Sequence, residues 1–328
     1  MASTFTEEFV QIGDSSLHML KGGSGEPLLL LHGAGGNRGW LSYVQALSEQ
    51  YTVYLPTHPG FGLSDRPEWI QNIHDLACFY TWFQEELDIE QIRCIGFSMG
   101  GWLAAEMAAL SRHSFSRLIL VDAAGIKPKH GEIKDIFIIT PEEVAELSFY
   151  DANQIPEYDK IYNSSPTPED RNLSERDREM AVRICWKPYM HSPRLPHILG
   201  RVSIPTAIIW GREDQLVPLE CGELYQQVIP GSTLSIINNC GHSPQIEKPD
   251  EESTYWNKDG TYMFIPNFVE FKDDRVLVYK DRMYWNGTYK YTYYARAIME
   301  GDFDLPSTKV QLMYSPQIAG FTPKDRIQ

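Results

Sequence analysis

The sequence predicts an α/β protein built on a doubly wound, mostly parallel sheet. Short apolar runs such as Leu28–Leu31 and Ile92–Phe97 alternate with amphipathic stretches of helical length such as Gly100–Leu110. Uninterrupted Val, Ile and Leu runs are typical of parallel strands that helices cover on both faces. With 42% hydrophobic and 22% charged residues among 328, the chain has ordinary globular composition and can bury a large core.

The expected elements follow one another along the first two thirds of the chain. A Gly13-Asp14 turn between two short apolar runs predicts a hairpin, and helical patterns such as Leu76–Leu87 separate the later runs. We assign residues 1–126 and 201–255 to this core. The expected strands are Phe9–Ile12, Leu17–Leu20, Leu28–Leu31, Tyr51–Leu55, Ile92–Phe97, Leu118–Val121, Thr206–Trp210 and Thr233–Ile237.

Between residues 127 and 200 the signals are helical only. Thr140-Pro141-Glu142-Glu143 is a capping box with proline at the first helical position. Ser174 is expected to begin a second helix, which must end near Lys187 because Pro188 follows. An insertion at this point predicts a helical cap over the carboxyl edge of the sheet, where open α/β sheets bind ligands.

The last part of the chain, residues 256–328, predicts a small β-rich unit. It carries 10 Lys and Arg against 9 Asp and Glu, although the whole chain has a formal net charge of −15. Trp285-Asn286-Gly287-Thr288 is a hairpin signal, and Tyr289, Tyr291 and Tyr293 follow it at strand period. We expect a separate domain here.

Charge and cysteine content restrict the class of partner. The net charge and a pI near 5 argue against nucleic acid or an anionic membrane as a partner. The chain has no transmembrane or secretory apolar run, and its five cysteines have neither metal-ligand nor redox spacing. We therefore expect a cytoplasmic protein that holds no metal.

The segment Gly96-Phe97-Ser98-Met99-Gly100 lies between a predicted strand and a predicted helix. A serine at such a sharp turn exposes its hydroxyl above the carboxyl edge of the sheet, while small residues two positions away let strand and helix pass closely. The motif by itself is common, so its strand-turn-helix context carries the argument. We therefore predict Ser98 as a nucleophile.

A serine nucleophile needs a base and an acid that orients the base. His242 lies on a loop directly after the last predicted strand of the sheet, at the same edge as Ser98. Asp214 follows the strand Thr206–Trp210, and its neighbour Glu213 is the alternative acid. The predicted triad is Ser98, His242 and Asp214.

Acyl transfer also needs donors for the developing oxyanion. We expect the backbone N–H groups of Met99 and Ala34, with Gly35 as an alternative to Ala34. The glycines of His32-Gly33-Ala34-Gly35-Gly36 also suggest a dinucleotide loop, but the required sixth glycine is Arg38 and no Walker lysine is present. No cofactor is expected.

Five motifs resemble the α/β-hydrolase superfamily, in family order and over about residues 5–252. The likeness is to the branch of small-molecule esterases, carbon–carbon bond hydrolases and cofactor-free haloperoxidases, and it implies the roles given above. A serine at position 98 disfavours the dehalogenases and epoxide hydrolases, which carry aspartate there. The motifs are Leu28–Gly33, Pro59–Ser64, Gly96–Gly101, Gly211–Asp214 and Gly241-His242.

Two features depart from that family. The long helix that usually follows the histidine segment is missing from the pattern after Asp250. The tail is similar to part of the terminal β-sandwich domain of bacterial alpha-macroglobulin-like proteins, which indicates either a fusion or a natural two-domain protein. This second resemblance rests on Val269–Val276, Gly287–Tyr291, Ala295–Ala297, Gly301–Phe303 and Met313–Pro316.

The sequence therefore predicts a serine hydrolase that cleaves small carboxylic esters through an acyl-enzyme. Two alternatives stay open at this point. The same triad supports carbon–carbon bond hydrolysis, for which Arg183 or Lys187 of the cap would hold a substrate carboxylate. The third reading is a catalytically silent binding protein of the same fold.

Overall fold

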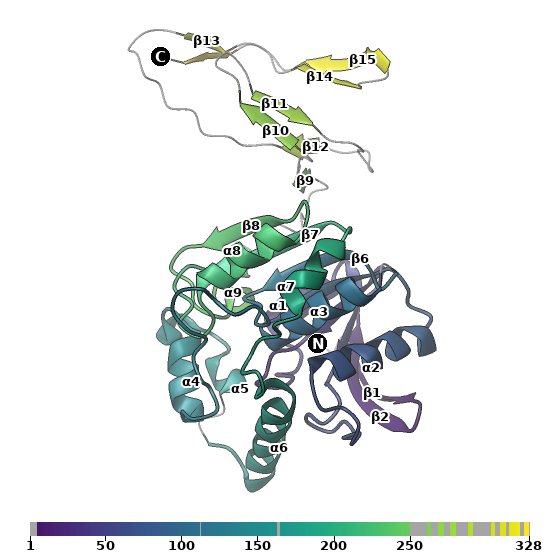
Figure 1. Cartoon of the computed structure of the whole chain (residues 1–328), viewed down its shortest axis with the longest axis vertical. Helices are drawn as coiled ribbons and strands as arrows, with labels where there is room; N and C mark the ends of the chain where they lie inside the picture. The colour runs from purple at the N-terminus through teal and green to yellow at the C-terminus, as the bar shows by residue number, and fades with distance from the viewer. Residues whose placement is uncertain are drawn as a thin grey trace.

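The computed structural model describes residues 5–111, 113–162 and 165–249, together with short strands between residues 261 and 327. An eight-stranded sheet, in the order β1-β2-β4-β3-β5-β6-β7-β8, forms its centre (Figure 1). β1 pairs antiparallel with β2 and β2 with β4, whereas every other neighbouring pair is parallel. The predicted doubly wound, mostly parallel sheet is confirmed.

All eight predicted strands are present, several of them longer than expected. The first two form the predicted hairpin, with Ile12 opposite Ser15 across the turn. The strands are β1 (Phe5–Ile12), β2 (Ser15–Gly22), β3 (Glu26–Leu31), β4 (Tyr51–Pro56), β5 (Ile92–Phe97), β6 (Phe115–Val121), β7 (Thr206–Gly211) and β8 (Thr233–Ile237).

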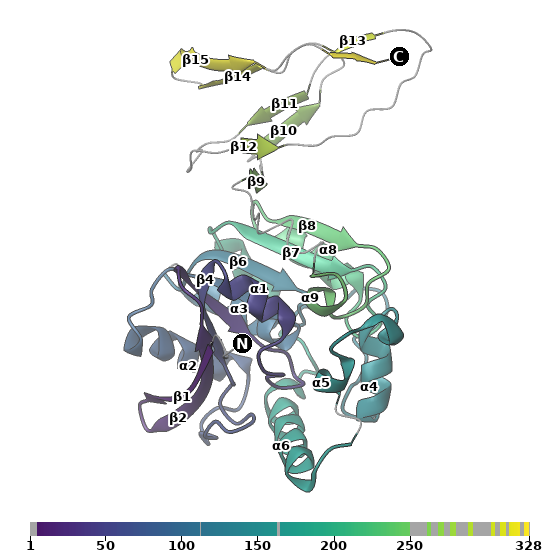
Figure 2. The same ribbon diagram turned by 180° about the vertical axis from the view of Figure 1, so that it is seen from behind.

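The leucine run of β3 shows how the sheet separates two apolar cores. Successive strand residues point to opposite faces, so Leu29 and Leu31 join a large buried cluster while Leu28 and Leu30 join a smaller one. The larger cluster lies under α2 (Ile73–Glu86), α3 (Met99–Leu110) and α8 (Leu219–Val228). α1 (Ser42–Ser48) covers the opposite face (Figure 2).

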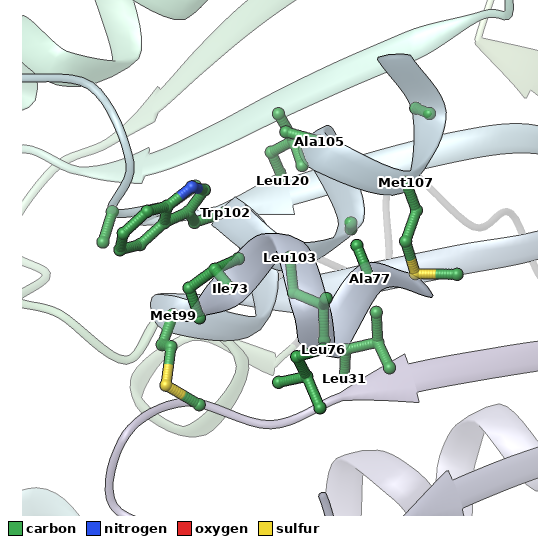
Figure 3. Close-up of a cluster of buried hydrophobic side chains, with 14 of the residues drawn as sticks. Leu31, Ile73, Leu76, Ala77, Met99, Trp102, Leu103, Ala105, Met107 and Leu120 are labelled. Carbon is green, nitrogen blue, oxygen red and sulfur yellow. The ribbon is translucent and has the colours of Figure 1, made fainter. Parts of the chain in front are cut away.

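Helix α3 runs through the larger core and carries the residues that follow the predicted nucleophile. It is buried along almost its whole length because helix α2 and strand β3 pack against it. Figure 3 shows Leu103 of α3 lying beside Leu76 of α2 and Leu31 of β3. The start of this helix is therefore fixed by dense apolar packing on several sides.

The insertion between β6 and β7 is helical, as predicted, but its main helix begins earlier than expected. α4 (Pro141–Ser148) has the predicted capping box at Thr140. α6 spans Pro168–Cys185, so Ser174 lies inside it rather than at its start. The Thr167 hydroxyl accepts from the Asp170 N–H and the Asp170 carboxylate accepts from the Thr167 N–H, a second capping box that fixes the true start.

Three polar contacts join α6 to the loop after β4. The Asp177 carboxylate accepts a 2.6 Å hydrogen bond from the Gly62 N–H. Arg176 donates to the Ser64 carbonyl, and Arg66 forms an ion pair with Glu179. The shorter elements of the insertion are η1 (Ala152–Gln154), α5 (Tyr158–Ile161), α7 (Leu195–Ile198) and η2 (Leu199–Arg201).

After α9 (Pro244–Glu247), the described residues form four separate two-stranded pairs. β10 (Phe268–Phe271) and β11 (Val276–Tyr279) pair antiparallel, as do β13 (Phe303–Leu305) with β16 (Asp325–Ile327) and β14 (Lys309–Leu312) with β15 (Ser315–Phe321). β9 (Thr261–Met263) pairs in parallel with β12 (Thr288–Lys290). The β-sandwich and the domain boundaries stay predictions.

Two other expectations fall on residues outside the described part. The missing helix was inferred for the segment after Asp250, and the hairpin turn for Asn286-Gly287. Within the described part, none of the helices is both long and apolar enough to cross a membrane.

Candidate active site

Ser98 lies at a sharp turn between β5 and α3, with a backbone φ of 52° and ψ of −116°. A non-glycine residue in this region is strained and persists only where its surroundings fix it. The Ser98 N–H donates to the Val121 carbonyl at 2.9 Å, and the Ser98 carbonyl accepts from the Ala124 N–H at 3.1 Å. Hydrogen bonds to strand β6 and to the residues that follow it therefore hold the Ser98 turn in place on one side.

The glycines around Ser98 are required by close backbone approach. A Cβ atom at Gly96 would lie 2.3 Å from the Gly100 carbonyl oxygen, and one at Gly100 would lie 2.1 Å from that of Leu31. Both distances are shorter than any van der Waals contact. The Gly-x-Ser-x-Gly pattern thus has the steric cause that the sequence interpretation gave it.

The structure brings the three predicted triad side chains together. His242 Nε2 lies 2.9 Å from Ser98 Oγ, and His242 Nδ1 lies 2.7 Å from Asp214 Oδ2. Since a carboxylate only accepts, Nδ1 carries the proton it donates to Asp214, and Nε2 is left to accept from the serine hydroxyl. This arrangement can deprotonate the hydroxyl of Ser98.

Asp214, rather than the alternative Glu213, is the acid beside the histidine. Asp214 Oδ1 accepts from the N–H groups of Leu216 and Val217 at 2.8 and 2.9 Å, which turns Oδ2 toward His242. Glu213 instead accepts from the Cys240 N–H at 2.9 Å and supports the histidine loop.

The histidine loop is attached to the insertion. The His242 N–H donates to the carbonyl of Ser148, the last residue of α4, at 2.9 Å. Glu247 joins the same two segments, because its carboxylate accepts from the N–H groups of both Gly241 and Tyr150. Partial burial raises the pKa of the Glu247 carboxyl.

A second carboxylate, which the sequence analysis missed, lies beside the triad. Asp122 follows β6, is 1% exposed and accepts a 2.9 Å hydrogen bond from the Gly211 N–H. One oxygen of Asp122, one of Asp214 and a ring nitrogen of His242 lie within 4.8 Å of one another. Its position after a strand between nucleophile and histidine is a signal that could have identified it.

The same three groups are close enough to offer ligands to a cation. His242 Nδ1 and Asp214 Oδ2 are already hydrogen-bonded to each other, so a cation at this point would have to displace the proton between them. Ligation there would compete with the orientation of His242.

The loop that carries Ala34 adjoins the nucleophile. A Cβ atom at Gly33 would lie 3.2 Å from Ser98 Cβ, so the two backbones are in close contact. Met99 is the first residue of α3, and the N–H groups of a first helical turn have no carbonyl partner within the helix. Both predicted donors thus lie around Ser98, and their role stays a prediction.

Comparison with known proteins places the chain in a family. The model of the alpha/beta hydrolase fold matches residues 26–138 and 145–249, which is more than half of the chain. The chain therefore belongs to the alpha/beta hydrolase fold family, and it is a hydrolase enzyme.

Carbon–carbon bond hydrolases and lipases both occur among the names of its relatives. The 2-hydroxy-6-oxononadienedioate/2-hydroxy-6-oxononatrienedioate hydrolase of Cupriavidus pinatubonensis is 28% identical and aligns over 74% of this chain and 91% of its own length. Lipase 3 of a Moraxella species is 27% identical, with 68% and 74% covered. Among solved structures, a bacterial membrane phospholipase A gives a TM-score of 0.66 at 25% identity, with 77% of this chain and 84% of that one covered.

The tail also matches a family model. The bacterial alpha-2-macroglobulin MG10 domain matches residues 228–317, in agreement with the predicted resemblance. This match begins at the last residue of α8, earlier than the expected boundary at 256, and overlaps the hydrolase match up to residue 249. In the overlap, β8 pairs with β7 in the hydrolase sheet.

Proposed function

We propose that this chain is a serine hydrolase that cleaves small carboxylic esters through an acyl-enzyme. The observation that carries the proposal is the continuous set of hydrogen bonds from Ser98 Oγ through the His242 ring to Asp214. A serine hydroxyl is a weak nucleophile until a base removes its proton, and the geometry supplies that base at 2.9 Å.

The reaction proceeds in two steps. Ser98 Oγ attacks the ester carbonyl carbon while His242 Nε2 takes the hydroxyl proton, and the proton then passes to the departing alkoxide. A water molecule attacks the acyl-enzyme in the second step, giving its proton to His242, which returns it to Ser98 Oγ as the carboxylic acid leaves. Asp214 stabilises the imidazolium formed in each step.

The backbone N–H groups of Ala34 and Met99 complete the proposed site. Each would donate to the oxygen that becomes negative when the carbonyl carbon turns tetrahedral. A donor fixed in place before the reaction contributes about 3 kcal/mol to the transition state. The contact of Gly33 with Ser98 supports this assignment for the Ala34 side.

Among the residues that the structure describes, neither Arg183 nor Lys187 forms a hydrogen bond or ion pair with the triad, so neither gives a reason to prefer a carbon–carbon substrate. These were the cations expected to hold the carboxylate of a dienoate substrate. Both are exposed, and Arg183 lines a surface depression with Arg66 and Glu179. Ester cleavage needs no such cation, because the triad and two amides are sufficient for it.

Carbon–carbon bond hydrolysis is the second candidate. Relatives that match over most of their length bear the names of such hydrolases. A different cation, Arg38, lies beside the loop His32–Gly36, which carries the proposed oxyanion donor Ala34 and is called the oxyanion loop below. A Cβ atom at Gly35 would be 2.9 Å from the Nη2 atom of Arg38. This guanidinium is near enough to the loop to meet a substrate carboxylate.

The test sets p-nitrophenyl esters of increasing acyl length beside a 2-hydroxy-6-oxo-dienoate ring-fission product. Turnover of short esters at a kcat/KM at least tenfold above that for the dienoate supports the ester proposal, and the reverse ratio supports the second candidate. Labelling with a fluorophosphonate reports on Ser98 directly. A folded wild-type protein with no Ser98 adduct and no turnover would show a silent binding protein.

A further inference from the structure

Behind the proposed oxyanion loop, two histidines and a tyrosine form a buried chain. His32 follows β3, His58 follows β4, and Tyr80 lies on α2. The three are at most 6% exposed, and the imidazole rings of His32 and His58 are 3.7 Å apart between centroids. None of these side chains takes part in the proposed chemistry, so their arrangement needs another explanation.

The hydrogen bonds of this chain have one consistent direction. The His58 N–H donates to His32 Nε2 at 2.9 Å, so His32 carries its proton on Nδ1, which donates to the Gly33 carbonyl at 2.8 Å. His58 Nε2 lies 3.0 Å from the His32 carbonyl and must donate to it. His58 Nδ1 therefore accepts from the Tyr80 hydroxyl at 2.6 Å.

Burial keeps every member of the chain neutral. Loss of water lowers the pKa of His32 to about 4 and that of His58 well below its usual value. Burial likewise raises the pKa of the Tyr80 phenol far above its usual value. Each imidazole thus keeps one donor and one acceptor nitrogen. His32 donates to the Gly33 carbonyl and accepts from the His58 N–H, and His58 donates to the His32 carbonyl and accepts from Tyr80.

The hydrogen bonds at the His32 end of this side-chain network fix the plane of the peptide bond between Gly33 and Ala34. The Gly33 carbonyl accepts from His32 Nδ1 and from the Gly36 N–H at 3.2 Å. In a trans peptide, the carbonyl of one residue and the N–H of the next belong to one plane and point in opposite directions. Holding the Gly33 carbonyl therefore sets the direction of the Ala34 N–H.

We propose that Tyr80, His58 and His32 are positioning residues that aim the Ala34 N–H at the oxyanion. His32 holds the peptide directly, and His58 and Tyr80 fix the orientation and tautomer of His32. This inference rests on the proposed function. It adds that one of the two donors is oriented by neutral side chains rather than by the loop backbone alone.

The first test compares two substitutions at one position. Asparagine at position 32 places an amide N–H near the site of Nδ1 and can still donate to the Gly33 carbonyl, whereas leucine cannot. With a short p-nitrophenyl ester, His32→Leu should lower kcat roughly a hundredfold with KM unchanged, the size expected for loss of one oxyanion donor. His32→Asn should retain at least tenfold more kcat than His32→Leu. Equal losses in the two variants would overturn the proposal.

Tyr80→Phe removes only a buried hydroxyl and tests the far end of the chain. It should lower kcat by about two- to tenfold, with KM unchanged, because His58 loses the bond that fixes it. The control is Gln84→Leu, which removes buried hydrogen bonds to Ser114 and Ile89 at the opposite edge of the sheet. Gln84→Leu should keep the wild-type kcat. A Tyr80→Phe loss no greater than that of the control would contradict the proposal.

A spectroscopic measurement on the unaltered chain does not depend on any variant folding. With 15N-labelled histidine at pH 7, nitrogen shifts should report His32 protonated on Nδ1 and His58 protonated on Nε2. Any other pair of tautomers overturns the inference. Failure of the proposed function is distinguishable, since wild-type protein would then show no Ser98 labelling although the tautomers are as stated.

Discussion

The two sides of Ser98 are built on different principles. On the base side, His242 lies among ionisable groups, with Asp214 at 2.7 Å and Asp122 close by. On the oxyanion side, the loop at Gly33 is held by uncharged partners, including a histidine whose pKa burial lowers to about 4. Charged carboxylates hold the base side in place, whereas hydrogen bonds between neutral groups hold the oxyanion side.

The proposed reaction explains the difference. A positive charge forms on the imidazole, and nearby carboxylates stabilise it in proportion to their charge and proximity. The negative charge forms on a substrate oxygen, where stabilisation depends on amides already aimed at the right point. Protonation of His32 would remove the acceptor for the His58 N–H and so disturb the orientation of the Ala34 N–H. The comparison therefore predicts different responses to mutation and to pH on the two sides.

The largest effect is expected at the nucleophile. Ser98→Ala should lower kcat for ester hydrolysis by about 10⁵- to 10⁶-fold, because the base is then left without a nucleophile. Initial rates and fluorophosphonate labelling measure this loss, and circular dichroism checks the fold. Ser111→Ala, at the far end of α3, is the control and should keep the wild-type rate. A residual Ser98→Ala rate within a hundredfold of wild type would place the chemistry elsewhere.

The second largest effect is expected from substitution of Asp214, the acid that orients His242. Asp214→Asn should lower kcat by about 10⁴-fold, because an amide can donate to Nδ1 and so favours the wrong tautomer of His242. Glu213→Gln is the matched control. It keeps an acceptor for the Cys240 N–H, and its loss should stay below tenfold. If both variants fell equally, Asp214 would have no special role.

Asp122→Asn sharpens the comparison, because it tests whether a second charge acts on the base side. A unit charge within 4.8 Å of the imidazole contributes on the order of 3 kcal/mol at an effective dielectric constant of 20. We expect kcat to fall by about a hundredfold, because about 1.4 kcal/mol corresponds to a factor of ten, and the rate is measured across pH 5 to 9. An unchanged or faster rate would mean that Asp122 does not stabilise the imidazolium.

Sequence reasoning reached the triad because each member follows a strand that could be recognised. Ser98, Asp214 and His242 come directly after β5, β7 and β8, and parallel strands bring such ends to one edge. Asp122 follows β6 in the same way, so the same rule could have predicted it.

Other features depend on information that a linear pattern lacks. The true start of α6 was missed because Thr167 and Ser174 are both plausible caps, and only the Asp170 contact decides between them. The close contact between the tilted rings of His32 and His58 could not be predicted. It depends on ring orientations across two neighbouring strand ends rather than on any spacing.

A smaller effect concerns pH and the oxyanion side. The folded pKa of His32, about 4, lies below its unfolded value of 6.5, so the unfolded chain binds more protons between these values. The contribution of His32 to stability should therefore be complete above pH 6.5 and fall by about 3 kcal/mol as the pH drops toward 4. Urea unfolding at several pH values measures the slope. His32→Asn should make this slope shallower, with the contribution of His58 remaining, whereas the exposed His130→Asn should leave the slope unchanged.

The smallest effect is expected from the tail. Every residue described at the site lies at or before position 247, so a chain ending after residue 255 should keep kcat within about twofold and remain in solution. Ester turnover and size-exclusion chromatography test both points. A loss above tenfold, or aggregation, would show that residues 256–328 support the hydrolase.

The bond between the His242 N–H and the Ser148 carbonyl ties the general base to the final residue of α4. A substrate too bulky for the insertion to accommodate cannot shift the end of that helix without either dragging the imidazole along or breaking this link. If contacts with a bulky substrate displaced the end of α4, we expect turnover to fall, because His242 would leave its position between Ser98 and Asp214.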